Sequence, residues 1–219
     1  MPFINTTPPA DATGDVRALY ERQQNAWGFV PNYARPFCHR PEIMTLWADL
    51  QRGIRSHVDP RRFELVTLAA ALALRSSYCS LAHARALQTF FTTEEIKAIV
   101  AGGDAARTVL SEAEVAMMAY AAKVATTPWR VTAGEIAALK AHGFSDAEVF
   151  DIAAAATARR FFSGLAEGLG CEADADFLEM DEGLRELLTV GRPISFRPVE
   201  RIESAPGLPE EARVAAGGA

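Results

Sequence analysis

Four capping boxes constrain the fold of this chain more than any other feature of its sequence. In each box a Ser or Thr stands three residues before a Glu, so the hydroxyl and the carboxylate can both accept hydrogen bonds from free N–H groups at a helix start. The four pairs are Thr92 with Glu95, Ser111 with Glu114, Thr132 with Glu135, and Ser145 with Glu148. A fifth start is marked by Asp59, a good N-cap, followed by Pro60 at the first helical position. Strand patterns are almost absent, so the predicted fold class is all-α.

Apolar residues that recur at intervals of three and four set the limits of further helices. They predict helices over about 15–24, 41–55 and 60–74. After its first turn the last of these is apolar on every side, so we expect it to be buried at the centre of the fold. About nine helices are expected in a single domain over residues 1–190. Residues 191–219 hold four prolines and are expected to form an irregular tail.

The composition limits the classes to which the chain can belong. Its 219 residues are 49% hydrophobic, which is enough for a substantial core. The formal charge of -6 comes from well-mixed charges without a basic block, so nucleic acid is not an expected partner. The start of the chain has no signal-peptide pattern and no apolar stretch matches a bilayer span, so we expect a cytoplasmic protein with no membrane partner. Three cysteines, Cys38, Cys79 and Cys171, leave at least one thiol free.

Candidate chemistry is concentrated in residues 75–83 (RSSYCSLAH), directly after the predicted buried helix. If a new helix begins near Ser77, Cys79 lies in its first turn, where free N–H groups and the helix dipole favour a thiolate. His83 is four residues further on and therefore lies on the same helix face as Cys79. A thiol beside an imidazole at a helix start has the arrangement of an activated nucleophile. Glu64, in the preceding helix, is the nearest candidate carboxylate.

Each of these residues, taken alone, also fits a structural role. A cysteine in an apolar helix is often a small buried hydrophobe. A lone histidine is often hydrogen-bonded and inert, and Glu64 lies early enough in its helix to interact with the dipole alone. The spacing of Glu64, Cys79 and His83, considered together, makes the functional interpretation specific.

That spacing resembles the alkylhydroperoxidase D-like family, which includes the carboxymuconolactone decarboxylases. Redox members carry a Glu in a buried helix, followed by a Cys-x-x-Cys-x-x-x-His motif that opens the next helix. Glu64, Cys79 and His83 match the Glu, the second cysteine and the histidine. The resemblance covers roughly residues 13–180 and implies an alkylhydroperoxidase D-like helical bundle. Further similarity to the peroxidase-related branch is carried by residues 27–33 (WGFVPNY), 39–42 (HRPE), 143–146 (GFSD) and 164–170 (GLAEGLG).

The chain departs from the family pattern at three places. Ser76 stands where redox members have the first cysteine, so no disulfide can form within the motif and a one-cysteine cycle would be required. Tyr78 replaces a histidine that is frequent in peroxidase members, and leaves a phenol that can form hydrogen bonds. Residues 159–164 (RRFFSG) stand where an asparagine-containing stretch is expected, which changes the predicted polarity of the substrate pocket.

The leading hypothesis is a peroxiredoxin-type, thiol-dependent peroxidase. Cys79 would attack the O–O bond of a hydroperoxide and become a sulfenic acid. His83 would hold or accept the thiol proton. Glu64, with a pKa raised by burial, would relay that proton, and Ser76 would donate a hydrogen bond to the sulfur. Reduction would need an external thiol, or else Cys38 or Cys171.

Two alternatives follow from the same family resemblance. In a carboxymuconolactone decarboxylase-like lyase acting on a lactone, His83 and Glu64 would be acid and base, Cys79 would only line the site, and Arg159 or Arg160 would bind a carboxylate. In the other, the chain has lost its activity and persists as an oligomeric scaffold.

Cofactors and partners complete the expectations. The sequence contains no metal-ligand cluster, dinucleotide fingerprint or P-loop, so no metal, nucleotide or flavin cofactor is expected. The substrate is expected to be a small hydroperoxide or lactone. The family resemblance also implies a homo-oligomer, commonly a trimer or hexamer.

Overall fold

The computed structural model describes residues 2–202, and within them the chain is built from helices. Short 3-10 helices join several of the α-helices, and only two isolated β-bridges, no strands, occur in this part. The predicted all-α class is therefore confirmed. No helix in the described range is long and apolar enough to cross a bilayer. The α-helices are α1 (Gly14–Trp27), α2 (Pro41–Arg55), α3 (Pro60–Ala73), α4 (Ser77–Leu87), α5 (Thr93–Ala101), α6 (Gly103–Arg107), α7 (Glu112–Thr126), α8 (Ala133–Ala141), α9 (Asp146–Gly168) and α10 (Glu182–Leu188), and the 3-10 helices are η1 (Pro9–Asp11), η2 (Asn32–His39), η3 (Pro128–Arg130) and η4 (Ala175–Glu179).

The predicted helix starts are present. All four capping boxes form in both directions, at the starts of α5, α7, α8 and α9. The Asp59 side chain accepts a hydrogen bond from the Arg62 N–H at the start of α3. Each such cap stabilises its helix by about 1 kcal/mol. These local signals therefore fix where five of the helices begin.

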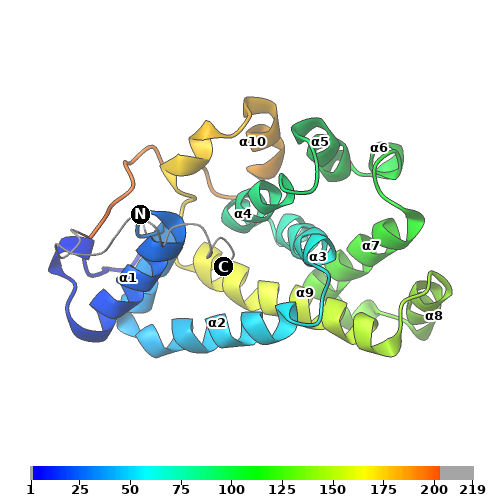
Figure 1. Cartoon of the computed structure of the whole chain (residues 1–219), viewed down its shortest axis with the longest axis horizontal. Coiled ribbons are helices and arrows are strands. Elements are labelled where there is room, and N and C mark those ends of the chain that lie inside the picture. Colours follow the sequence, from blue (N-terminus) through cyan, green and yellow to red (C-terminus); the bar gives the residue numbers. More distant parts are fainter. Residues whose placement is uncertain (1, 203–219) are drawn as a thin grey trace.

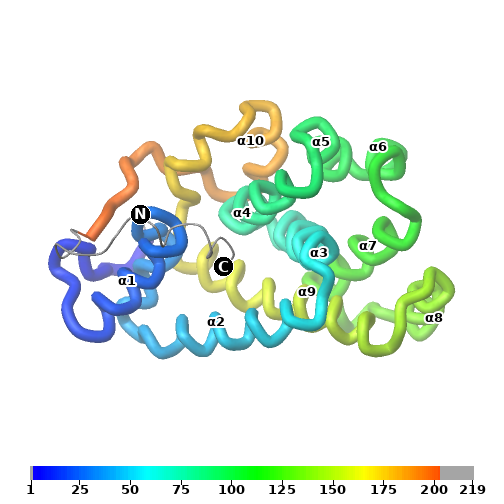
Figure 2. Tube along the Cα trace, in the orientation of Figure 1, coloured from blue at the N-terminus to red at the C-terminus, as the bar shows by residue number. Residues whose placement is uncertain are grey.

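Helix α3 is the centre of the molecule. It is buried continuously from Phe63 to Ala71, as its apolar sequence predicts. It packs against α4, α7 and α9, and Figure 1 shows it in the middle of the fold with these three helices around it. Helix α2 runs along one edge of the molecule beside α9 (Figure 2). Glu64 in α3 is consequently enclosed between the central helices and α2.

Residues 191–202 form no helix but are attached to the helical body. Gly191 N–H donates to Ser77 Oγ (2.8 Å), Ser195 N–H donates to the Ala173 carbonyl (2.8 Å), and Val30 N–H donates to the Glu200 carbonyl (2.9 Å). Figure 1 shows this segment returning from α10 to the N-terminal part of the chain. The remainder of the predicted tail, 203–219, lies outside the described residues.

Candidate active site

A tight connection places the candidate nucleophile at the start of α4. Arg75 has a left-handed backbone (φ 56°), and the Ser76 N–H donates to the Ala71 carbonyl, which reverses the chain after α3. Ser76 is the N-cap of α4, so Cys79 is the third residue of the helix, in its first turn as predicted. Because the connection is so short, α3 and α4 pack side by side and bring Glu64 and His83 together.

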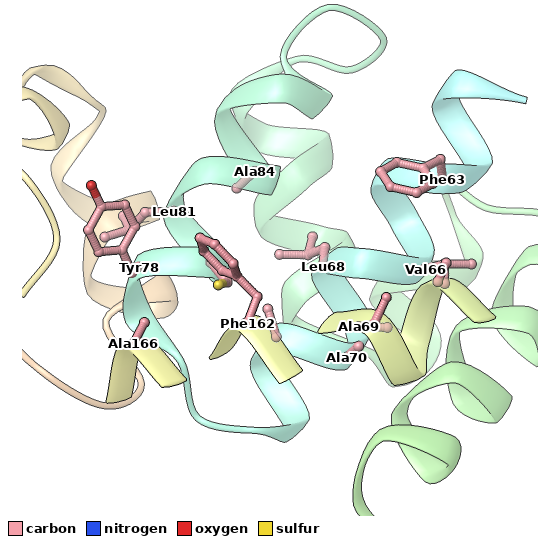
Figure 3. Packing of buried hydrophobic residues seen from close by; sticks show 14 of the residues in the cluster. Phe63, Val66, Leu68, Ala69, Ala70, Tyr78, Leu81, Ala84, Phe162 and Ala166 are labelled. Atoms are coloured by element: carbon pink, nitrogen blue, oxygen red, sulfur yellow. The ribbon is translucent and has the colours of Figure 1, made fainter. Parts of the chain in front are cut away.

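Cys79 is buried beside an arginine from a distant part of the chain. Its side chain is 2% exposed, and its sulfur accepts a hydrogen bond from Arg159 Nη1 at 3.8 Å. Arg159, in α9, is itself only 3% exposed, and its guanidinium carbon lies 5.3 Å from the ring centres of both Trp47 and Phe162. Figure 3 shows Phe162 reaching from α9 toward α3 and α4, between Tyr78 and Leu68. The thiol is therefore enclosed by a cation and aromatic rings.

His83 and Glu64 form a buried hydrogen-bonded pair. His83 Nδ1 lies 2.7 Å from Glu64 Oε2 and 3.1 Å from Thr67 Oγ1. The other carboxylate oxygen of Glu64, Oε1, lies 3.4 Å from Arg55 Nη2 at the end of α2. Arg55 is partly exposed, so Glu64 connects a buried imidazole to a guanidinium that reaches the surface.

The predicted rise in the pKa of Glu64 is wrong. Burial is the largest single influence and does raise the pKa, but His83, Arg55 and Arg159 together outweigh burial and lower the pKa below its ordinary value. The sequence suggested the burial but not the two arginines that reach this carboxylate from α2 and α9. Glu64 is therefore ionised at neutral pH and acts as a hydrogen-bond acceptor.

The protonation of His83 follows from the same contacts. Burial and then Arg159 lower the pKa of His83 below its ordinary value, although Glu64 opposes them. A neutral imidazole that donates its Nδ1 proton to the Glu64 carboxylate leaves the lone pair on Nε2. Nε2 is buried and has no hydrogen-bond partner among residues 2–202, so the structure contains no hydrogen bond between His83 and Cys79. This nitrogen is available as a base for a group that enters the site.

Of the two supporting residues, Ser76 does not make its predicted contact with the sulfur, whereas Tyr78 forms a hydrogen bond. Ser76 is fully buried next to Glu167, and the hydrogen bond to the Cys79 sulfur comes from Arg159 instead. The Tyr78 hydroxyl donates to the buried carboxyl group of Asp174, and Figure 3 shows it pointing away from Phe162. Asp174, which sequence reasoning did not single out, also accepts a hydrogen bond from the Asn32 N–H at 2.9 Å. Tyr78 and Asp174 thus hold the start of α4 against the N-terminal part of the chain.

The other two thiols have different surroundings. All three cysteines are free. Cys171 is buried, and burial raises the pKa of its thiol to about 12. Cys38 is partly exposed, and its sulfur accepts a hydrogen bond from the Thr7 N–H at 3.4 Å.

The two arginines of residues 159–164 (RRFFSG) differ in their exposure to solvent. Arg160 is exposed and lies outside the site. Arg159, by contrast, is buried. A spacing signal existed, because residues 155, 156, 159, 162, 163 and 166 repeat at helical intervals and are all buried. The same kind of signal places Trp47, Gln51 and Arg55, each four residues apart, on the inner face of α2.

The helical bundle is similar in fold to solved peroxidase-related proteins, one of which is an alkylhydroperoxidase AhpD core. A model of the carboxymuconolactone decarboxylase family matches residues 41–123 of the chain. The matched segment runs from the start of α2 into α7 and contains Glu64, Cys79 and His83, so this part of the chain is similar to the carboxymuconolactone decarboxylase family. No curated protein matches the chain.

Solved structures share the fold over most of the chain. An alkylhydroperoxidase AhpD core, a peroxidase-related protein from Ralstonia eutropha JMP134, is 24% identical with a TM-score of 0.66, over 81% of this chain and 94% of that one. A peroxidase-related protein from Silicibacter sp. TM1040 is 19% identical with a TM-score of 0.70, over 82% and 95%. A debrominase, Bmp8, solved as a cysteine-to-alanine variant with 2,3,4-tribromopyrrole, is 18% identical with a TM-score of 0.63, over 85% and 95%. At these identities the likeness establishes the fold.

Proposed function

We propose that the protein is a cytoplasmic, thiol-dependent peroxidase of the peroxiredoxin type, which reduces hydroperoxides through Cys79. The observation that carries the proposal is the contact between the buried Cys79 sulfur and Arg159 Nη1, because a guanidinium in that place can donate to a thiolate. The free Nε2 of His83, on the same face of α4, supplies a base.

The first half-reaction consumes the peroxide. His83 Nε2 takes the thiol proton, directly or through a water, and the thiolate attacks one oxygen of the O–O bond. An S–O bond forms, the O–O bond breaks, and both of its electrons leave on the other oxygen. The imidazolium, held by the Glu64 carboxylate at Nδ1, returns the proton to that oxygen and releases an alcohol. Cys79 is oxidised by two electrons to a sulfenic acid.

The second half-reaction restores the thiol. Because Ser76 cannot form a disulfide, a small-molecule or protein thiol from outside condenses with the sulfenic acid and releases water. A second thiol then attacks the mixed disulfide and frees Cys79. Burial raises the pKa of the Cys171 thiol to about 12, which disfavours Cys171 as the internal resolving group.

A direct test measures hydroperoxide consumption with an excess of a monothiol reductant. The wild type and a Cys38→Ser variant should turn over, whereas Cys79→Ser should be inactive. Trapping with dimedone followed by peptide mass spectrometry should place the sulfenic acid at Cys79. The proposal is wrong if Cys79→Ser retains full turnover, or if no hydroperoxide is consumed with any thiol tested.

A lyase function is the second candidate. Arg159 favours it as a carboxylate-binding residue, because it forms no salt bridge within residues 2–202 and lies close enough to His83 to lower its pKa. A lactone bearing a carboxylate, and a brominated pyrrole because of the debrominase likeness, therefore belong in the same screen. Lactone turnover that survives Cys79→Ser but not His83→Asn would establish the lyase. Absence of all three activities would favour the oligomeric scaffold.

We also propose that the chain forms a homo-oligomer through α2 and α9. Ile43, Leu46 and Leu50 form an exposed apolar face on α2, and the exposed Phe161 of α9 lies 5.6 Å from Trp47, between ring centres. Such contiguous apolar surface is typical of subunit interfaces. Light scattering of the purified protein should give the mass of a trimer or hexamer, and a Leu46→Glu/Leu50→Glu variant should give a smaller species.

A further inference from the structure

Arg159 is a buried cation without a carboxylate partner among residues 2–202. It is 3% exposed, and no ion pair joins it to an acidic side chain in residues 2–202, where other guanidiniums such as those of Arg61 and Arg85 are paired. The acidic residue that feels its charge, Glu64, is already engaged by His83 and Arg55. A buried charge ordinarily has a counter-ion, so the missing partner of Arg159 points to a ligand.

The free part of the guanidinium has a defined geometry. Nη1 donates to the Cys79 sulfur, whereas Nε and Nη2 are buried and have no partner among the described residues. These two nitrogens form one edge of the planar fork, and that edge matches the two oxygens of a carboxylate. In Arg192 the corresponding edge of the guanidinium is occupied, because its Nε and Nη2 both donate to the Glu167 carbonyl, at 3.2 and 2.9 Å.

The surroundings of this edge favour a planar, singly charged organic anion. The rings of Trp47 and Phe162 stack at 5.1 Å between centres and flank the guanidinium, so apolar surface dominates there. Ser163, four residues after Arg159 on the same face of α9, has a buried hydroxyl that finds no hydrogen-bond partner in the described part of the chain. One guanidinium edge and one hydroxyl suit a carboxylate better than a phosphate, which needs more positive charge.

We infer that Arg159 binds the carboxylate of a small apolar or aromatic acid, and so determines which substrates reach Cys79. The carboxylate lies on the Nε and Nη2 edge, with the apolar body against Trp47 and Phe162. Because Nη1 of the same group contacts the sulfur, the carboxylate is held within one guanidinium width of the thiol. The inference deepens the proposed function, in which the substrate would be a hydroperoxide that carries a carboxylate.

The test measures binding without chemistry. Benzoate, benzamide and inorganic phosphate are titrated by calorimetry into the reduced wild-type protein, Arg159→Gln, Arg159→Lys and Arg160→Gln. Benzoate should bind at least about tenfold more tightly than benzamide or phosphate, because only a carboxylate satisfies the free edge. Arg159→Gln should abolish this preference, Arg159→Lys should keep part of it, and the exposed Arg160→Gln should leave it unchanged.

Several results would overturn the inference. These are equal binding of benzoate and benzamide by the wild type, tighter binding of phosphate than of benzoate, or an unchanged benzoate preference in a folded Arg159→Gln. If Arg159→Gln does not fold, the comparison of probes on the wild type and Arg159→Lys still decides. Benzoate binding by a protein that consumes no hydroperoxide would leave the carboxylate site in place and remove only the peroxidase function.

Discussion

Replacing Asp174 with Asn should change how the stability of the protein depends on pH. Burial, as the largest influence, raises the pKa of Asp174 from its ordinary 3.8 to about 7, although hydrogen bonds from Tyr78 and the Asn32 N–H lower it. Asp176 raises the pKa of Asp174 and Arg85 lowers it. Above pH 7 the folded protein therefore holds a buried, ionised carboxylate, which disfavours the folded state.

The sign and size of the effect follow from proton linkage. Between pH 3.8 and about 7 the folded state binds more protons at Asp174 than the unfolded state, so its contribution to stability is full below pH 3.8 and is lost as the pH rises toward 7. A shift of about three pKa units at 1.36 kcal/mol per unit gives roughly 4 kcal/mol. Asp174→Asn removes this titration, so its free energy of unfolding should gain roughly 4 kcal/mol relative to wild type between pH 4 and pH 8.

The measurement is urea unfolding of both proteins, followed by circular dichroism at several pH values. Only the difference between the two proteins is interpreted, because Glu64 and His83 titrate in both and cancel. A difference between Asp174→Asn and wild type that stays flat, or that falls as the pH rises, would refute the reasoning.

Three further predictions concern the site and its supports. Glu64→Gln should reduce hydroperoxide turnover by at least about tenfold, because the carboxylate no longer fixes the tautomer of His83. In the wild type Glu64 raises the pKa of His83, so the variant should also move the acid limb of the pH–rate profile to lower pH, and an unmoved limb would contradict this. The new thiol of Ser76→Cys should form a disulfide with Cys79 after peroxide treatment, because an N-cap side chain faces the third helical residue. Mass spectrometry of the unreduced peptide should detect this disulfide, and a peptide with two free thiols would disprove the prediction. Gly191→Ala should lower the free energy of unfolding by about 1–3 kcal/mol, because the new Cβ would stand 2.0 Å from the Arg75 carbonyl oxygen. Gly164 lies in a helix with open space around it, so Gly164→Ala should not have this effect, and equal effects of the two variants in urea titrations would argue against the close approach.

The features that could be predicted from the sequence are those that depend on residues close together in the chain. Capping boxes act within four residues, so the starts of α5, α7, α8 and α9 could be placed from the sequence. The pairing of Glu64 with His83 could be anticipated because one short turn joins the two helices that carry them. The five-residue helix α6 has no side-chain cap and gave no signal.

What could not be predicted depends on contacts between distant segments. Arg159 meets Cys79 across 80 positions, and Tyr78 meets Asp174 across 96. Neither pair has a local pattern, and the tertiary packing of α9 and of the segment after it decides both. The direction of the Glu64 pKa shift failed for the same reason, because it depends on Arg55 and Arg159 from other helices.

The position of α9 has a consequence for how such proteins are classified. The segment that the family model matches, residues 41–123, carries Glu64, Cys79 and His83, whereas Arg159 enters the site from a helix that begins at Asp146. A classification based on that segment therefore groups chains by these three candidate site residues and takes no account of the cation beside the sulfur. Chains that agree over this segment but differ at the position of Arg159 should be sorted by α9 before a shared substrate is assigned to them.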